Sequence, residues 1–143
     1  GNKLVTHQVA GAALGPVICY EIINDRLVSE MSASSKALIV QTNSATFSGT
    51  AESRQQLAIT RIRAKEYARS ILSVSTIGIS AFIDSNGEVV DEIGENVQGY
   101  LTGDLRLSDH TTNASEWGTL IKIIILSLFA LFGLRSFRKG RAV

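Results

Sequence analysis

The single cysteine of the chain, Cys19, is the side chain best suited to covalent chemistry. It lies in the sequence GPVICYE, residues 15–21, where an apolar strand is expected to end and a helix to begin shortly after. A side chain at such a corner projects from the carboxyl edge of a sheet, where the sites of α/β proteins form. The start of the helix would favour the thiolate and offer N–H groups to an oxyanion. This arrangement predicts a nucleophile that forms a thioester, although on composition alone a lone cysteine in an apolar run is more often a buried hydrophobic residue.

The other polar side chains are weaker candidates for catalysis or metal binding. Glu21 follows Cys19 by two residues and could act as an acid, a base or an orienting group, or simply be a solvated acid at a helix start. His7 and His110 have no second histidine or carboxylate at ligand spacing, and one cysteine cannot form a cysteine-cluster metal site. The chain also lacks a glycine-rich phosphate loop and a Gly-x-Ser-x-Gly elbow. We therefore expect neither a metal nor a cofactor.

These residues must be positioned by alternating strands and helices. A continuous apolar run at residues 36–42 predicts a buried strand, and Asn86-Gly87 predicts a hairpin with a type I′ turn. Residues 43–49 form a polar loop, after which Thr50 is a candidate N-cap for a helix with many basic residues. That basic face is expected to be solvated, with contact to an anionic lipid head as the alternative. The pattern predicts an α/β or α+β layered sheet, with strands at 3–9, 13–20, 36–42, 71–75, 79–84, 88–93 and 97–105 and helices at 22–32 and 50–70.

The charge of the chain is divided unevenly along its 143 residues. The total of +1 argues against a nucleic-acid partner, since such proteins usually carry a large basic excess. Through Gly118 there are 9 basic and 13 acidic residues, which gives −4, whereas the remainder has 5 basic residues and no acidic one, which gives +5. The chain therefore has an acidic body and a basic end.

The basic end follows a long apolar segment. Between residues 120 and 134, 11 residues are Leu, Ile or Phe, and together they favour membrane insertion by roughly 5 kcal/mol. Lys122 opposes insertion by at most about 3 kcal/mol, and by less if it lies near the interface. We expect residues 118–137 to span a membrane, with a buried core helix as the alternative. The basic residues beyond Leu134 then place the tail in the cytoplasm and the body on the outer face.

Four motifs in order resemble the bacterial apolipoprotein N-acyltransferase family, whose catalytic domain belongs to the nitrilase, or carbon–nitrogen hydrolase, superfamily. The motifs are ICYE at 18–21, QTN at 41–43, QQLA at 55–58 with RIRA at 61–64, and STIGISA at 75–81. The resemblance covers nearly the whole chain, and the terminal span with its basic tail is similar to the last helix of the family.

The resemblance implies a fold and a mechanism. The fold would be the C-terminal half of a nitrilase-like αββα sandwich, followed by one transmembrane helix. Cys19 matches the nucleophile of a Glu–Lys–Cys triad, which takes an acyl chain from a phospholipid and passes it to the N-terminal amine of a diacylglyceryl-cysteine apolipoprotein. The Tyr20 N–H would donate to the oxyanion and Glu21 would orient the site. The enzyme would lie in the bacterial inner membrane with its catalytic domain on the periplasmic face.

The departures from the family limit what this chain can do alone. The Glu and Lys of the triad lie upstream of the cysteine in the family, and Lys3 is too close to Cys19 to stand for the latter. Where many members have NDAWF, this chain has NSATF at 43–47. We therefore expect a C-terminal fragment that is inactive alone, with a half catalytic domain at 1–107, a connector at 108–117, the span at 118–137 and a basic tail at 138–143. The alternatives are a nitrilase-type amidase and a non-catalytic, tail-anchored module.

Overall fold

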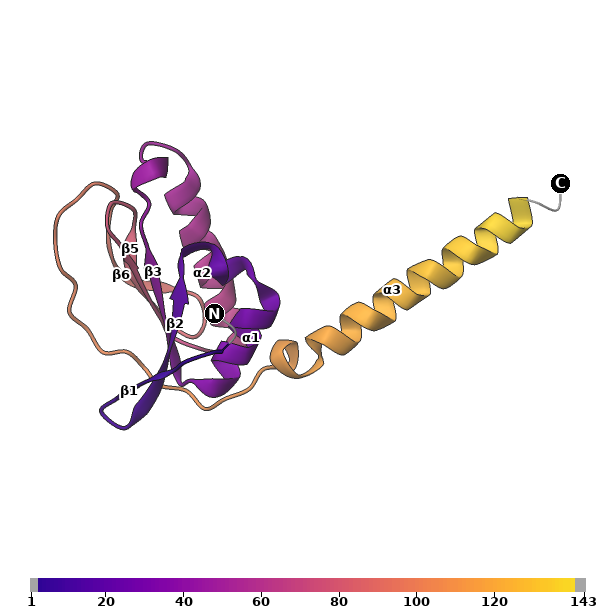
Figure 1. The fold of residues 1–143 in the computed structure, drawn as a ribbon, viewed down its shortest axis with the longest axis horizontal. Coiled ribbons are helices and arrows are strands. Elements are labelled where there is room, and N and C mark those ends of the chain that lie inside the picture. The colour runs from indigo at the N-terminus through magenta and orange to yellow at the C-terminus, as the bar shows by residue number, and fades with distance from the viewer. Residues whose placement is uncertain (1–2, 141–143) are drawn as a thin grey trace. The chain divides into compact units, whose positions relative to one another are not determined.

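The computed structural model describes residues 3–140, with side chains described as far as residue 133. The chain divides into two compact units, residues 1–112 and 113–143. The first unit is a layered α/β structure and the second is a single long helix (Figure 1). The whole of the predicted basic tail at 138–143 therefore lies outside the residues whose side chains are described.

The first unit is built on one mixed sheet of six strands in the order β1-β2-β3-β4-β5-β6. Its centre is parallel, because β2 pairs with β3 and β3 pairs with β4 in parallel, whereas the other neighbours are antiparallel. The strands are β1 (His7–Val9), β2 (Ala12–Ile18), β3 (Ala37–Thr42), β4 (Ile71–Ser75), β5 (Ser80–Ile83) and β6 (Val89–Ile93).

Two helices follow the parallel strands and cover one face of this sheet (Figure 1). A five-residue 3-10 turn, η1 (Cys19–Ile23), leads into α1 (Asp25–Ser34), and a second short turn, η2 (Ala45–Phe47), precedes α2 (Glu52–Tyr67). The side chain of Asn24 caps α1 by accepting a hydrogen bond from the Leu27 N–H at 3.1 Å. The predicted helix at 22–32 is therefore found slightly later, since η1 occupies its first turn.

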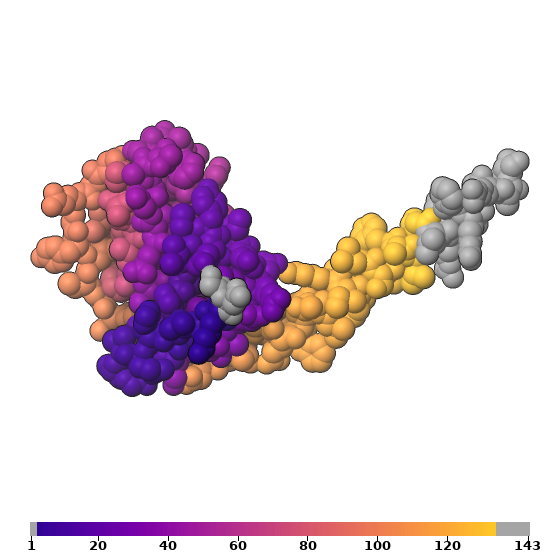
Figure 2. All heavy atoms as spheres, in the orientation of Figure 1, coloured from indigo at the N-terminus to yellow at the C-terminus, as the bar shows by residue number. Residues whose placement is uncertain are grey.

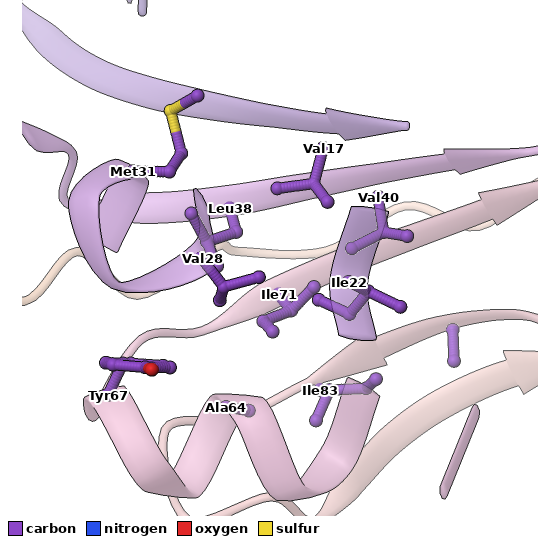
Figure 3. Packing of buried hydrophobic residues seen from close by; sticks show 11 residues of the cluster. Val17, Ile22, Val28, Met31, Leu38, Val40, Ala64, Tyr67, Ile71 and Ile83 are labelled. Carbon is purple, nitrogen blue, oxygen red and sulfur yellow. The ribbon is translucent and has the colours of Figure 1, made fainter. Parts of the chain in front are cut away.

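The core lies between the helices and alternate residues of the strands (Figure 3). Val17, Val40 and Ile71 are fully buried, as expected for side chains on the helix-covered face. The intervening residues on the other face remain open, since Ile18 is 60% exposed and Val74 is 44% exposed. The helix-covered side of the sheet is thus a complete core, and the far side is an apolar surface.

Two local predictions are wrong in detail. Thr50 is not the N-cap of α2, because Ala51 occupies that position; the Thr50 hydroxyl instead accepts a hydrogen bond from the Glu52 N–H at 3.3 Å. The β5–β6 hairpin is confirmed, but its turn is not type I′. Only Gly87 of the Asn86-Gly87 pair has a positive φ, at 81°, and the Gly87 N–H donates to the Asp84 carbonyl. This is the geometry of a type I turn followed by a left-handed glycine.

The strand predicted at 97–105 is absent, because residues 94–112 contain no strand in the described structure. These residues, orange in Figure 2, lie along one side of the first unit, where Gly103 approaches the Phe82 ring. The end of the segment is fastened by Arg69, which is 5% exposed and donates to the carbonyl of His110 at 2.6 Å. Burial lowers the pKa of Arg69. Its hydrogen bonds to main-chain carbonyls replace those that an exposed guanidinium would make with water.

The second unit is α3 (Asn113–Gly140). Within Asn113–Gly133, an 18-residue window has a mean hydropathy of 1.7, and none of that window is buried by protein. By length and composition it is able to cross a membrane. The helix begins at Asn113, so residues 113–117, which belong to the predicted connector, already form its first turns.

Candidate functional site

Cys19 occupies a strained corner at the carboxyl end of β2. Its φ of 52° is in the left-handed region, which non-glycine residues rarely adopt and which is found at functional sites. The strand ends at Ile18 and η1 begins at Cys19, so the thiol sits at the predicted strand-to-helix corner. The thiol is free and half-buried. It is therefore not the buried hydrophobic residue that its apolar surroundings suggested.

The parallel register brings two further loops to the same edge of the sheet. Ile18 pairs with Gln41, and Thr42 pairs with Ser75, so the carboxyl ends of β2, β3 and β4 lie next to one another. The side chain of Asn43 joins two of these loops by accepting a hydrogen bond from the Thr76 hydroxyl at 2.8 Å. Three of the four sequence motifs thus meet at one edge.

The fourth motif supports that edge from α2. The Gln56 amide donates to the Thr42 hydroxyl at 2.7 Å, in a buried position. Gly78 closes the gap between the loops, since a Cβ at this position would lie 2.7 Å from the Ser44 hydroxyl and 2.8 Å from that of Ser75. A larger residue at position 78 would therefore push the β3 and β4 loops apart.

Glu21 braces the corner that carries Cys19. One of its carboxylate oxygens accepts a hydrogen bond from the Ile18 N–H at 2.8 Å. The residue is exposed and also lines a cavity of about 390 Å³ together with Lys3, Pro16 and Arg26. The contact suits an orienting role for Glu21.

Tyr20 lies against residues from the β3–α2 connection. Its ring packs edge-on against Phe47, with centroids 6.5 Å apart and an interplanar angle of 73°. Its phenol lies beside the carboxylate of Glu52, and both partial burial and this negative charge raise the pKa of Tyr20. Phe47 and Glu52 therefore belong to the surroundings of Cys19.

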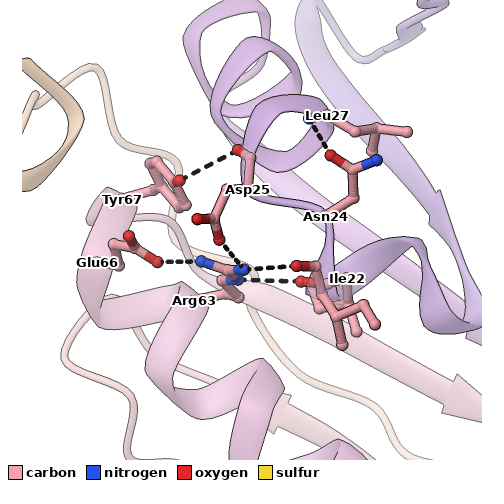
Figure 4. A network of polar contacts seen from close by, with 8 residues as sticks. Ile22, Asn24, Asp25, Leu27, Arg63, Glu66 and Tyr67 are labelled. Atoms are coloured by element: carbon pink, nitrogen blue, oxygen red, sulfur yellow. Dashed lines mark hydrogen bonds and ion pairs between the residues drawn. The ribbon is translucent and has the colours of Figure 1, made fainter. Parts of the chain in front are cut away.

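A network centred on Arg63 holds the corner onto α2 (Figure 4). The guanidinium donates to the carbonyls of Ile22 and Ile23, both at 3.0 Å, at the end of η1. It also pairs with Asp25 at 2.5 Å and with Glu66 at 2.6 Å. Burial lowers the pKa of Arg63, but the hydrogen bonds with the two carboxylates outweigh it and raise the value, so the side chain stays charged.

The expectation of a solvated basic face on α2 is wrong for part of it. Arg63 is 11% exposed and serves the network above, and Arg61 donates to the Gly87 carbonyl at 2.7 Å.

Sequence reasoning missed the contributions of Phe47, Glu52 and Arg63 to the site. Only Arg63 left a signal, because it lies within the RIRA motif at 61–64; periodicity cannot show that Glu52 is buried.

A sheet with a parallel centre, helices on one face and a strained cysteine at its carboxyl edge defines an α/β protein of the nitrilase type. Residues 1–113 match the family model described as carbon-nitrogen hydrolase. The chain therefore belongs to the carbon-nitrogen hydrolase family.

Within that family, the chain is similar to apolipoprotein N-acyltransferases. It is 34% identical to the protein of that name from Mycolicibacterium smegmatis over 120 residues, which cover 83% of this chain and 20% of the relative. It is 31% identical to the Coxiella burnetii protein of the same name over 126 residues, which cover 87% of this chain and 26% of the relative. The chain thus spans about a quarter or less of the length of these curated relatives.

Solved structures show the same fold. The chain is similar to Saccharomyces cerevisiae Nit3, a member of branch 10 of the nitrilase superfamily, with a TM-score of 0.60, 21% identity, and coverage of 68% of this chain and 39% of that chain. It is also similar to the amidase from Nesterenkonia sp. AN1, with a TM-score of 0.57, 16% identity, and coverage of 67% of this chain and 40% of that chain. The nitrilase-superfamily fold predicted from the motifs is confirmed.

Proposed function

We propose that this chain supplies the nucleophile-bearing, C-terminal part of a membrane-bound apolipoprotein N-acyltransferase. The observation that carries the proposal is the strained, half-buried thiol of Cys19 at the carboxyl edge of the parallel strands, in a chain similar to enzymes of that name. The strain and the surrounding loops suit a nucleophile, because they hold the thiol at an exposed edge of an otherwise packed sheet.

The proposed reaction has two steps. In the first, the Cys19 thiolate attacks the ester carbonyl of a phospholipid. The ester C–O bond breaks, a thioester forms, and the lysophospholipid leaves with a proton. In the second, the α-amine of a diacylglyceryl-cysteine apolipoprotein attacks the thioester, the C–S bond breaks, and an amide and the free thiol result. The N–H of Tyr20 stabilises the oxyanion in both steps, and Glu21 keeps the corner in position.

The far face of the sheet supports the proposal that further protein completes the site. Strand residues there alternate with the core residues and stay open, with Ile18 60% exposed and Val74 44% exposed. An apolar face of this kind is suited to packing against a second sheet, as the four-layered sandwich requires. The Glu and Lys of the family triad would come from that other half, so we expect this chain alone to be inactive.

The helix α3 supports a membrane location. Its apolar side chains are unburied over Asn113–Gly133, and residues 135–141 include four basic residues. By the positive-inside rule we propose that the basic end is cytoplasmic and that the catalytic unit lies on the periplasmic face of the inner membrane. Both the phospholipid donor and the diacylated lipoprotein acceptor would then be within reach of Cys19.

The acylation step provides the direct test. Incubation of the full-length enzyme with phospholipid should give an acyl group on Cys19 that is detected by mass spectrometry and removed by hydroxylamine. A Cys19→Ala variant should form no such adduct and leave the lipoprotein diacylated. N-acylation by Cys19→Ala would overturn the nucleophile assignment. A wild-type enzyme without an adduct, but with amide hydrolysis, would favour the amidase alternative, and one without either activity would favour the non-catalytic module.

Topology has a separate test. A cysteine introduced near Arg141 of a Cys19→Ala background should be protected from an impermeant thiol reagent in intact cells. One introduced at exposed Asn86 in the β5–β6 turn should react once the outer membrane is permeabilised. Labelling near Arg141 in intact cells would overturn the proposed orientation.

A further inference from the structure

The carboxylate of Glu52 is buried beside the Tyr20 phenol and has no cationic partner among the described residues. The residue is 7% exposed, and among the described residues neither of its side-chain oxygens has a hydrogen-bond partner of good geometry. A buried carboxylate without compensation is costly. Natural proteins keep such a group where a ligand or another charge completes it.

Glu52 lies at the start of a helix and takes part in no ion pair of the described residues. It is the first residue of α2, a helix of 16 residues, and the positive end of the helix dipole stabilises a carboxylate there. The carboxylate is therefore placed where a cation could pair with it, and the described part of the chain supplies none.

The chemistry around Glu52 selects the kind of cation. A divalent metal needs several ligands, and no group of three or more His, Cys, Asp or Glu residues able to hold a metal occurs among the described residues. The neighbours are aromatic instead. Tyr20 lies beside the carboxylate and packs against Phe47, and the Thr50 hydroxyl connects the Phe47 carbonyl to the Glu52 N–H. A carboxylate next to aromatic rings suits an organic ammonium group.

We propose that Glu52 is a binding residue for the primary ammonium group of a substrate of Cys19. The inference rests on the proposed function, in which two substrates can carry such a group. One is the acceptor lipoprotein, whose α-amine must approach the thioester. The other is a phospholipid donor with an ethanolamine head group. Because Tyr20 follows Cys19 in the sequence and its phenol lies beside Glu52, either ammonium would be held next to the reacting thiol.

The two half-reactions of the full-length enzyme distinguish these sources. Acylation of Cys19 is followed in single turnovers with micelles of phosphatidylethanolamine or of phosphatidylglycerol, whose head group carries no ammonium. Transfer is followed from the isolated acyl-enzyme to a diacylated lipopeptide with a free α-amine, or to hydroxylamine as a small uncharged nucleophile. Glu52→Gln keeps the size and hydrogen-bonding oxygen of the side chain but removes its charge.

We expect Glu52→Gln to weaken binding of the ammonium-bearing substrate about tenfold or more and to leave binding of the substrate without an ammonium group unchanged. A raised KM for the lipopeptide identifies the acceptor as the source, and slower acylation by phosphatidylethanolamine alone identifies the head group. Equal losses for substrates with and without an ammonium group, or no loss at all, would overturn the inference. A variant at Glu92, which is exposed on β6, provides the matched control and should behave as the wild type.

The thermal stability of Glu52→Gln and the acylation of wild-type Cys19 separate two further explanations. If Glu52 instead paired with a cation elsewhere in the enzyme, Glu52→Gln would lower the thermal midpoint and slow both half-reactions alike, which contradicts the inference. If the wild-type enzyme formed no acyl-Cys19, the proposed function would fail before the role of Glu52 was reached.

Discussion

The carboxylate of Glu21 accepts a hydrogen bond from the N–H of Ile18 at 2.8 Å, across the corner that carries Cys19. The bond closes a short loop around the nucleophile, whose φ is 52°. A left-handed non-glycine residue is retained only where its surroundings impose the conformation. Glu21 supplies one of those constraints from within the loop itself.

Loss of the hydrogen bond between Glu21 and the Ile18 N–H should slow the acylation of Cys19. We expect Glu21→Ala in the full-length enzyme to reduce the single-turnover rate of Cys19 acylation by about 10- to 100-fold, because small displacements of a nucleophile are costly. Glu21→Gln retains an acceptor oxygen and should recover most of the rate with an unchanged KM for phospholipid. If Glu21→Gln were as slow as Glu21→Ala, the carboxylate would have a role beyond positioning.

The Arg63 network should dominate the attachment of η1 to α2. Arg63→Lys removes the planar group that serves two carbonyls and two carboxylates at once, and a lysine cannot reproduce that geometry. We expect a loss of about 2 kcal/mol in the free energy of unfolding, measured by urea titration of the full chain in detergent.

Arg26 provides the matched control for this substitution. It pairs with Glu30 at 2.7 Å on the exposed side of α1, and its side chain is 87% exposed. Arg26→Lys should therefore leave the urea unfolding curve nearly unchanged, because an exposed ion pair contributes little to stability. Similar losses for the two variants would contradict the structural importance of the Arg63 network.

Sequence patterns were informative where local chemistry decides the structure. The continuous apolar run at 36–42 gave a buried strand, and Cys19 lies at the corner that its flanking residues predicted. The strand expected at 97–105 failed because its apolar residues have no strand beside them; Tyr100 is 87% exposed. A strand depends on a partner that periodicity does not identify.

The surroundings of Cys19 were less accessible to sequence reasoning. From the sequence, Glu52 is an ordinary acid in the first turn of a helix, whereas in the structure it is buried and lies beside Tyr20. Arg63 reads as part of a solvated basic face, yet its partners lie about 40 residues earlier in the chain. Such contacts are set by tertiary packing.

Asp84 should make the β5–β6 hairpin sensitive to acid. Its carboxylate accepts hydrogen bonds from the N–H groups of Glu88 and Asn86, both at 2.9 Å, and these lower its pKa below the usual value. A lowered folded-state pKa stabilises the protein above the unfolded value of about 3.9, and this contribution is lost as the pH falls through the folded value.

Asp84→Asn isolates this contribution, since the amide oxygen can still accept the turn hydrogen bonds. We expect the variant to be about 1 kcal/mol less stable than the wild type at pH 7, with the difference shrinking below about pH 4. Thermal midpoints of the full chain from pH 2 to 7 measure it. The same substitution at exposed Asp104 should give no such trend, and a constant difference for Asp84→Asn would contradict the assignment.

The backbone of Cys19 makes a prediction that is independent of its reactivity. A φ of 52° costs a residue with a Cβ about 1 kcal/mol or more relative to glycine. Cys19→Gly should therefore be more stable than Cys19→Ala by about 1 kcal/mol in urea titrations of the full chain, although neither variant can form a thioester. At Ala58, an exposed position within α2, Ala58→Gly should instead lose about 1 kcal/mol. Opposite signs at the two positions would show that the strain is local to the nucleophile, whereas a Cys19→Gly variant no more stable than Cys19→Ala would mean that the corner relaxes without the thiol.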